Sequence, residues 1–279
     1  MSKTWKIGLS VLAALCLLAL CALWRGLTLR FYTLRTDKLA AGAHLRLALL
    51  TDLHSCVYGK DHRELLDLVT QQRPDAILLG GDIVDDVEPL ENAMSFFDQL
   101  SRLGIPVYYV SGNHDRWRPD FESVLKAIEG YGVTILEGQT VALDLPGGRV
   151  NLCGLREYAG ADACAGALAS AFSGLSQDAY NILLSHRPDY IELYRRYPFD
   201  LVLCGHTHGG QVRIPFLVNG LYAPNQGWFP PYAGGLYDLE GVQMIVSRGL
   251  SYNPRLPRVF NPPEVVIVDI EGASKTAQT

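Results

Sequence analysis

The stretch Leu201-Val-Leu-Cys-Gly-His-Thr-His-Gly-Gly210 guides the interpretation of the whole chain. Its first four residues form a short apolar run that predicts a buried strand, and the run ends at Gly205. His206 and His208 follow, with glycines on both sides that allow a sharp turn. Such a turn can bring both imidazoles to one place, and neutral imidazole is a common metal ligand. The stretch therefore indicates a strand end that carries candidate metal ligands.

The same arrangement recurs at other points of the chain after His44. Apolar runs at 45–50, 76–79, 107–110 and 182–184 each end in polar residues that can bind metals. Amphipathic helical patterns lie between several of these runs, at 64–72, 89–103, 119–129 and 188–197. Alternating strands and helices predict a largely parallel sheet with helices packed on it. Since ligands bind outside the carboxyl ends of such strands, we expect all these strand ends to gather at one edge of the sheet.

The residues that follow the strands provide one set of oxygen and nitrogen donors: Asp52, His54, Asp82, Asn113, His186, His206 and His208. This set is too large for one tetrahedral zinc ion and suits two metal ions that share a bridging carboxylate. Mixed carboxylate, amide and imidazole ligands suit divalent or trivalent Mn, Fe or Zn. Two metals about 3.5–4 Å apart can stabilise the attacking and leaving oxygens of a phosphoryl displacement.

Taken in chain order, these residues form motifs that resemble the five signature motifs of the calcineurin-like metallophosphoesterase family. The motifs are Asp52-x-His54, Gly81-Asp82, Gly112-Asn113-His114-Asp115, His186 and Gly205-His206-Thr207-His208. Two further segments resemble a membrane-anchored bacterial branch: the Gly-His-Thr-His-Gly-Gly-Gln stretch at 205–211 and the tail from Ser247 through Glu264. That branch includes general phosphodiesterases and an enzyme that cleaves the pyrophosphate of UDP-2,3-diacylglucosamine. The resemblance implies a metal-dependent phosphoester hydrolase.

The resemblance also implies a role for each residue of the motifs. Two triads would each hold one metal and one carboxylate would bridge both metals: Asp52, His54 and His208; Asn113, His186 and His206; and Asp82. A hydroxide between the metals would attack phosphorus. The catalytic residues would be His114, which donates a proton to the leaving oxygen or stabilises the developing charge, and Asp115, which orients His114.

We therefore predict an α/β fold, a four-layer α/β/β/α sandwich of two stacked mixed sheets flanked by helices and preceded by one transmembrane helix. Shorter strand patterns at 133–136, 141–145 and 150–153, with closing strands at 242–247 and 265–270, indicate the second sheet. The expected organisation has four parts: an N-terminal anchor at 1–25, a juxtamembrane linker at 26–43, the metallophosphoesterase domain at 44–271 and a flexible tail at 272–279.

The N-terminal run from Ile7 to Trp24 carries no charged side chain and is long enough to span a bilayer once. A cleaved signal peptide is the alternative, but Leu23-Trp24-Arg25 offers no small-x-small cleavage site. More basic residues follow the run than precede it, which favours a cytoplasmic catalytic domain. The net charge of −5 argues against nucleic acid as a partner.

Two features bear on the substrate. Arginine matches phosphate oxygens, and Arg116 and Arg258 are the candidate substrate-binding residues. The segment 215–237 contains Trp228, Phe229 and Tyr232, which either pack on the core or contact acyl chains or the membrane surface. We expect a phosphodiester or pyrophosphate substrate that is lipid-linked, such as UDP-2,3-diacylglucosamine. Hydrolysis of soluble nucleotide phosphoesters and a non-catalytic metal-binding scaffold are the alternatives.

Overall fold

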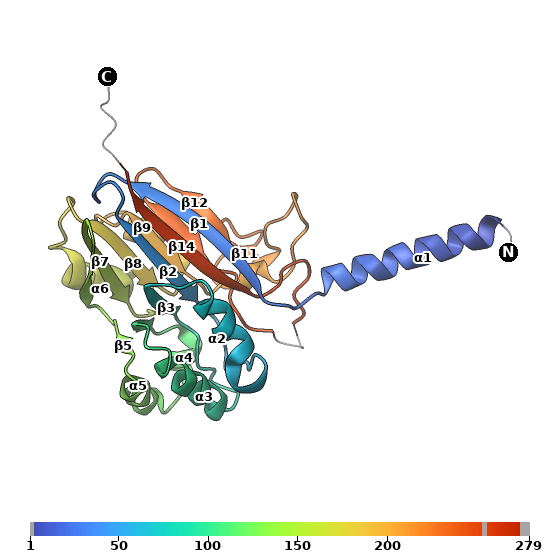
Figure 1. Ribbon diagram of the computed structural model, residues 1–279, viewed down its shortest axis with the longest axis horizontal. Helices are drawn as coiled ribbons and strands as arrows, with labels where there is room; N and C mark the ends of the chain where they lie inside the picture. The colour runs from blue at the N-terminus through green and yellow to red at the C-terminus, as the bar shows by residue number, and fades with distance from the viewer. Residues whose placement is uncertain (1–2, 253–255, 274–279) are drawn as a thin grey trace, which may run out of the picture.

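The computed structural model describes residues 3–252 and 256–273. Two six-stranded sheets stack face to face, and helices cover the outer face of each sheet (Figure 1). Both sheets are mixed, because each combines parallel and antiparallel neighbours. The predicted sandwich of two mixed sheets flanked by helices is confirmed.

The first sheet has the strand order β1-β14-β2-β3-β4-β5. Of the strand pairs described in it, only that between β14 and β2 is antiparallel. The bounds are β1 (Thr28–Thr36), β2 (His44–Leu50), β3 (Ala76–Gly80), β4 (Val107–Val110), β5 (Thr134–Ile135) and β14 (Glu264–Gly272). Helices α2 (Arg63–Thr70), α3 (Leu90–Ser101) and α5 (Phe121–Gly130) cover its outer face, and the short α4 (Asn113–Trp117) begins just after β4. The 3-10 turn η1 (Lys60–His62) precedes α2.

The second sheet has the order β12-β13-β9-β8-β7-β6, with antiparallel pairs at both edges. Its bounds are β6 (Thr140–Leu145), β7 (Gly148–Leu155), β8 (Tyr180–Ser185), β9 (Leu201–Cys204), β12 (Gly235–Asp238) and β13 (Gln243–Val246). Helices α6 (Ala161–Phe172) and α7 (Ile191–Tyr194) pack on its outer face. A separate hairpin joins β10 (Tyr222–Ala223) to β11 (Gly227–Trp228), and two 3-10 turns are η2 (Pro188–Tyr190) and η3 (His208–Gly210).

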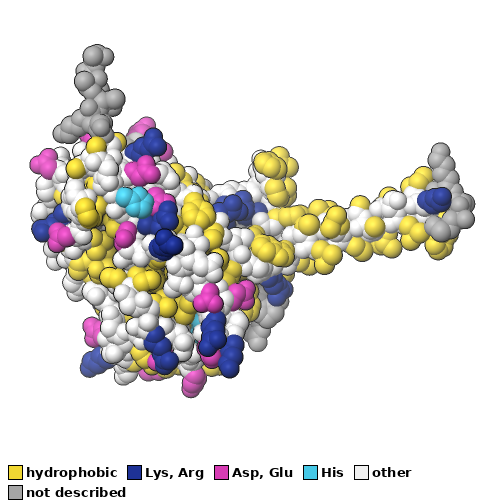
Figure 2. Space-filling view, in the orientation of Figure 1, with side chains coloured by type: hydrophobic (Ala, Val, Ile, Leu, Met, Phe, Trp, Pro, Cys, Tyr) yellow, Lys and Arg dark blue, Asp and Glu magenta, His cyan; other side chains and the backbone are white. Residues whose placement is uncertain are grey.

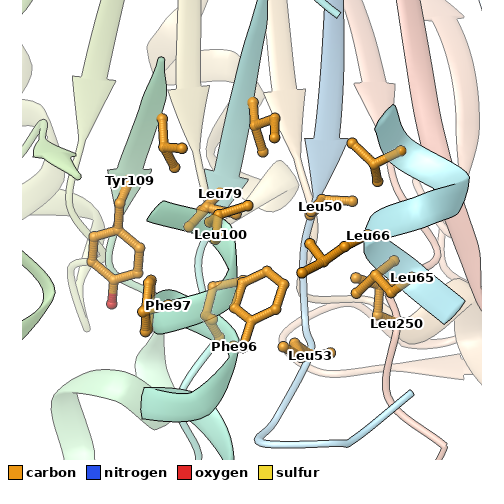
Figure 3. Close-up of a cluster of buried hydrophobic side chains, with 14 of the residues drawn as sticks. Leu50, Leu53, Leu65, Leu66, Leu79, Phe96, Phe97, Leu100, Tyr109 and Leu250 are labelled. Atoms are coloured by element: carbon orange, nitrogen blue, oxygen red, sulfur yellow. The ribbon is translucent and has the colours of Figure 1, made fainter. Parts of the chain in front are cut away.

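Side-chain alternation along buried strands builds the layers. In β2, Leu47 and Leu49 point into the core between the sheets, whereas Ala48 and Leu50 point toward the helices. Figure 3 shows Leu50 among the leucine and phenylalanine side chains that α2 and α3 contribute. The alternation fixes the register of β2, because a shift by one residue would exchange its two buried faces.

Strand β1 occupies residues that we expected to be a juxtamembrane linker, so that expectation is wrong for 28–36. The strand pairs in parallel with β14, from Thr28 opposite Glu264 to Thr36 opposite Gly272. Leu34 is its only fully buried residue, so the strand has little hydrophobic signal of its own. Its backbone is paired by a strand more than 200 residues away in the sequence. Of the expected tail, residues 274–279 lie outside the described part of the chain.

The N-terminal helix α1 (Lys3–Ala22) projects away from both sheets (Figure 1). Its apolar side chains face outward along its length (Figure 2). The stretch Thr4–Ala22 is long and apolar enough to cross a membrane, although a signal sequence would share those properties. The helix is therefore a candidate membrane span.

Candidate metal centre

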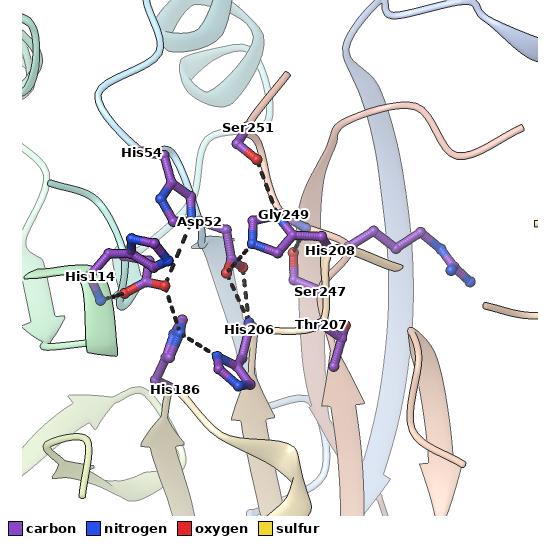
Figure 4. Close-up of polar contacts among 12 residues, drawn as sticks. Asp52, His54, His114, His186, His206, Thr207, His208, Ser247, Gly249 and Ser251 are labelled. Carbon is purple, nitrogen blue, oxygen red and sulfur yellow. Dashed lines mark hydrogen bonds and ion pairs between the residues drawn. The ribbon is translucent and has the colours of Figure 1, made fainter. Parts of the chain in front are cut away.

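The candidate metal ligands follow five parallel strands that belong to two different sheets. Asp52, Asp82 and Asn113 follow β2, β3 and β4 of the first sheet. His186 follows β8, and the segment with His206 follows β9, both in the second sheet. The expectation that one sheet edge carries all of them is therefore wrong. The sheets stack so that the ends of their strands meet, which brings both groups together (Figure 4).

Two clusters of potential ligand atoms lie side by side. Asp52, His54 and His208 form the first, and Asp82, His186 and His206 form the second. Asp82 lies between them, because its Oδ2 is 3.6 Å from His54 Nε2 and 3.1 Å from His186 Nε2. Within each cluster all ligand atoms lie within 4.8 Å of one another. This spacing suits atoms that bind a common cation.

The second ring nitrogen of each imidazole has its own partner. His54 Nδ1 lies 2.7 Å from Asp85, and His186 Nδ1 lies 2.8 Å from the carbonyl oxygen of Gly80. The two remaining rings are held in the same way: His206 Nε2 is 2.7 Å from Asn225 Oδ1, and His208 Nδ1 is 3.1 Å from Ser251 Oγ. Such partners fix the orientation and the tautomer of a metal-binding imidazole.

The local charges favour a cation. Burial lowers the pKa of His206 to about 4 and that of His208 to about 3, so both rings are neutral at pH 7 and can donate a lone pair to a metal. Burial would also lower the pKa of His186, but the neighbouring Asp82 carboxylate outweighs it and raises that pKa to about 10. The field of the buried carboxylates thus attracts positive charge to this position.

Two unpaired atoms test whether a metal fits these residues. His54 Nε2 and Asn113 Oδ1 are buried, and neither has a hydrogen-bond partner within the described residues. A buried polar atom without a partner is costly, and a metal ion would satisfy both atoms. Gly205 packs closely against this site, since a Cβ there would lie 2.5 Å from Asp52 Oδ2. The residues therefore fit a bound metal.

The backbone is strained where the candidate ligands lie. Positive φ angles occur at Asp52, His54, Asp82, His206 and His208. Residues other than glycine seldom adopt this conformation, and it costs of order 1–3 kcal/mol at each position. Strain of this kind persists where the surrounding structure enforces it, and it clusters at functional sites. The buried strands that precede these residues provide that constraint.

The expected pairing of Asp115 with His114 is wrong. The Asp115 carboxylate instead accepts backbone hydrogen bonds from Asp82 at 2.7 Å, from Val84 at 2.8 Å and from Gly112 at 2.8 Å. His114 Nδ1 lies 2.6 Å from Asp86 Oδ1, and its ring is partly exposed. Since α4 turns the two neighbouring side chains in different directions, Asp115 holds the loops and Asp86 holds the imidazole.

The two arginines expected to bind substrate differ in exposure. The half-buried Arg116 lies over the ring of Phe121 at 5.3 Å. Arg258 is only 3% exposed, and its guanidinium donates to the carbonyl oxygens of Ser251 and Arg248. Arg258 therefore supports the segment that carries Ser251, the partner of His208, and does not present its guanidinium to solvent.

Several residues of the site were not predicted. Asp85 and Asp86 follow Asp82 closely in the sequence, and an acidic pair beside a motif could have indicated partners for the imidazoles. Ser251 and Asn225 carry no such signal, because they lie in loops outside the motifs and reach His208 and His206 only after folding. The sequence pattern identifies the potential ligands better than it identifies the residues that orient them.

Comparison with known proteins agrees with this geometry. The sequence profile of the calcineurin-like phosphoesterases matches residues 45–210, more than half of the chain. The chain belongs to the calcineurin-like phosphoesterase family. The matched range includes the potential ligands from Asp52 to His208.

Relatives of this phosphoesterase occur in several bacteria. Phosphodiesterase YaeI of Escherichia coli is 32% identical, over 82% of this chain and 83% of its own length. An uncharacterized metallophosphoesterase of Campylobacter jejuni is 35% identical, over 82% of this chain and 59% of its own length. One from Helicobacter pylori strain J99 is 33% identical, over 79% of this chain and 58% of its own length. The chain thus spans less than two thirds of the Campylobacter and Helicobacter relatives.

A solved structure from Thermus thermophilus has a similar fold. It aligns with 75% of this chain and 91% of its own chain, with a TM-score of 0.50 and 14% sequence identity. At this low identity the similarity supports the fold alone.

The structural role of Asp115 can be tested by stability. Replacing it with alanine leaves three buried N–H groups without an acceptor, so we expect Asp115→Ala to lower the free energy of unfolding by roughly 3–5 kcal/mol. Urea denaturation measures the change. The matched control is Asp144→Ala, which removes an exposed carboxylate and should change stability little. Equal stability of the two variants would contradict the role of Asp115.

Proposed function

We propose that this phosphoesterase hydrolyses a phosphodiester or pyrophosphate bond with two divalent or trivalent metal ions, such as Mn, Fe or Zn. The observation that carries the proposal is the pair of adjacent clusters on either side of Asp82. Asp52, His54 and His208 would hold one ion, Asn113, His186 and His206 the other, and Asp82 would bridge them. The bound ions would supply Lewis acidity toward the phosphate oxygens and lower the pKa of an attacking water.

His114 is the proposed proton donor to the leaving oxygen. Its ring meets the His54 ring edge to face, with a centroid distance of 4.5 Å, yet it remains partly open to solvent. Asp86 accepts a hydrogen bond from Nδ1, which leaves Nε2 free to face the substrate. Asp86 is therefore proposed as the positioning residue for His114.

The proposed substrate is lipid-linked, because the candidate membrane span belongs to the same chain as the metal centre. A glycolipid pyrophosphate such as UDP-2,3-diacylglucosamine has the required bond. The relative YaeI is named a phosphodiesterase, and that name supports hydrolysis of a phosphodiester. The excess of basic residues after the apolar run supports a catalytic domain on the cytoplasmic side of the membrane. Hydrolysis of soluble nucleotide esters is the competing proposal.

Activity toward bis-p-nitrophenyl phosphate tests the metal-dependent chemistry. We expect the Mn-loaded protein to release p-nitrophenol, and chelation of the metal to abolish the reaction. Asp82→Ala and Asn113→Ala should lose activity by at least about a hundredfold, because each removes a proposed ligand. Asp98→Ala, which removes a partly exposed carboxylate on α3, serves as the control. Full activity in both ligand variants would reject the proposal, and a metal-loaded but inert wild type would favour a non-catalytic scaffold.

The leaving group tests the role of His114. His114→Asn should slow hydrolysis of a diester with an alkyl leaving group by about 10²–10³-fold, and should affect a p-nitrophenyl leaving group much less, since p-nitrophenolate leaves without a proton. Asp86→Asn should also slow hydrolysis of the alkyl diester more than that of the p-nitrophenyl diester, with a smaller loss of rate than His114→Asn. Metal content, measured by elemental analysis, should remain that of the wild type. Equal losses on both substrates would exclude proton donation.

The contact between Asn225 and His206 can be tested by metal affinity. Asn225→Ala removes the partner of His206 Nε2 and should weaken Mn binding by about 10–100-fold. Asn225→Asp keeps an acceptor oxygen and is the matched control, with affinity closer to the wild type. Calorimetric titration of the metal-free protein measures both. If Asn225→Ala binds Mn as tightly as the wild type, the contact does not orient a ligand.

A further inference from the structure

Exposed apolar side chains gather where α1 leaves the domain. Four of them form what we call the apolar rim: Phe216, Leu217, Trp228 and Phe229. Phe216 is completely exposed, Leu217 is 81% exposed, Trp228 68% and Phe229 65%. Hydrophobic side chains cluster around the base of α1 in Figure 2. A single exposed apolar residue is ordinary, but a group of large ones at one end of a domain marks an interaction surface.

Backbone hydrogen bonds connect the first loop of the rim to α1. The amide of Phe260 donates to the carbonyl oxygen of Ala22, at the end of the helix, at 2.7 Å. The amide of Arg213 donates to the carbonyl oxygen of Val259 at 2.9 Å, and Ile214 forms an antiparallel backbone bridge with Val218. Phe216 and Leu217 form the tip of this loop. They are therefore held close to the point where α1 begins its path away from the domain.

The second loop of the rim reaches the metal centre. The amide of Phe229 donates to the carbonyl oxygen of Leu221 at 2.8 Å. The amide of Leu221 in turn donates to the carbonyl oxygen of Gly210, which belongs to the turn that begins at His208. The rings of Tyr222 and Trp228 stack edge to face across the hairpin at 5.4 Å. Asn225, at the turn of this hairpin, contacts His206. One short hairpin thus carries an exposed tryptophan and a group that orients a potential ligand.

For Tyr232 the structure favours packing on the core, one of the two alternatives that the sequence left open for the segment 215–237. Its ring meets that of Tyr237 edge to face at 5.2 Å, and both contact the core on the outer face of the second sheet. The rim is therefore built from the two loop tips. Phe216 and Leu217 lie within the segment 215–237, although the sequence did not single them out.

We propose that the apolar rim inserts into the headgroup layer of the bilayer that α1 crosses and so places the metal centre next to the membrane surface. We choose the bilayer as the partner of the rim because α1 joins the domain at the end where the rim lies. Tryptophan and phenylalanine on protruding tips suit the interface of a bilayer, where apolar rings meet headgroups. This orientation gives a lipid-borne phosphoester direct access. That last step rests on the proposed function, whereas insertion itself does not.

Insertion can be measured without activity. The sequence contains four tryptophans, Trp5, Trp24, Trp117 and Trp228. The full chain with the first three changed to phenylalanine reports on Trp228 alone. In phosphatidylcholine–phosphatidylglycerol vesicles with brominated acyl chains, we expect blue-shifted Trp228 emission that loses roughly half its intensity. Emission that is blue-shifted but not quenched by bromine would mean that a second copy covers the rim, and it would overturn the proposal, as would water-like emission.

A matched control uses the opposite end of the second sheet. Strand β7 runs parallel to β8 and β9, so the β6–β7 turn lies at the end away from the metal centre. Asp144 beside this turn is exposed. Asp144→Trp, in a chain with all four native tryptophans changed to phenylalanine, should show water-like emission without bromine quenching. Quenching equal to that of Trp228 would also overturn the proposal, because it would not be specific to the rim.

A kinetic comparison then separates the rim from the chemistry. Phe216→Ser/Leu217→Ser should hydrolyse a diacylglyceryl p-nitrophenyl phosphate in vesicles roughly tenfold more slowly than the wild type. Its rate on soluble bis-p-nitrophenyl phosphate should be unchanged. The exposed Leu236→Ser on β12 is the control for loss of a surface apolar group. If the double variant and the wild type hydrolyse the vesicle substrate at equal rates, the rim does not give the metal centre access to lipid-borne phosphoesters. A wild type that inserts but cleaves neither ester would reject the proposed function and leave insertion intact.

Discussion

The burial of two carboxylates at the junction of the sheets is the constraint on which this structure depends. Asp52 and Asp82 are almost completely inaccessible to solvent. A buried carboxylate is tolerated only with compensating partners. Asp52 accepts from the amide of His206, and Asp82 accepts from the amide of His114. His54 and His186, whose pKa values are raised by the neighbouring carboxylates, provide further compensation, so removing either imidazole would leave negative charge less compensated in the interior.

This constraint explains why the backbone around the site is unusual. Each donor must turn sharply at the end of its strand to face a common centre, and several donors do so at positive φ. Glycines leave room for the turns: a Cβ on Gly112 would collide with the Asp82 carboxylate. Buried, hydrogen-bonded strands precede these turns and hold them in place, so the sandwich maintains the strained backbone of the site. The stability of the fold and the geometry of the site are therefore linked.

The position of α1 determines which end of the domain, and with it the metal centre, lies toward a membrane. The helix ends beside the segment around Phe260, and that segment pairs with the loop that begins just after Gly210. Few residues thus separate the candidate membrane span from the histidines of the last motif. In a membrane-bound protein, this arrangement would set the distance of the metal centre from the bilayer by backbone hydrogen bonds, without a long flexible connection. A short, fixed connection limits the orientations that a domain can adopt at a surface.

Local sequence determined the strands, most of the helices and the potential ligands. A buried strand needs a run such as Leu201 to Cys204, and a metal-binding turn needs donors and glycines directly after it, so both leave a local pattern. Helix α6 was missed because its alanine-rich sequence has little amphipathic contrast. Only the tertiary structure decided which sheet each strand joins, that β1 pairs with β14, and that Asp86 and Asn225 orient the imidazoles. These contacts join residues distant in the chain, and their partners are chosen by packing, which no local pattern encodes.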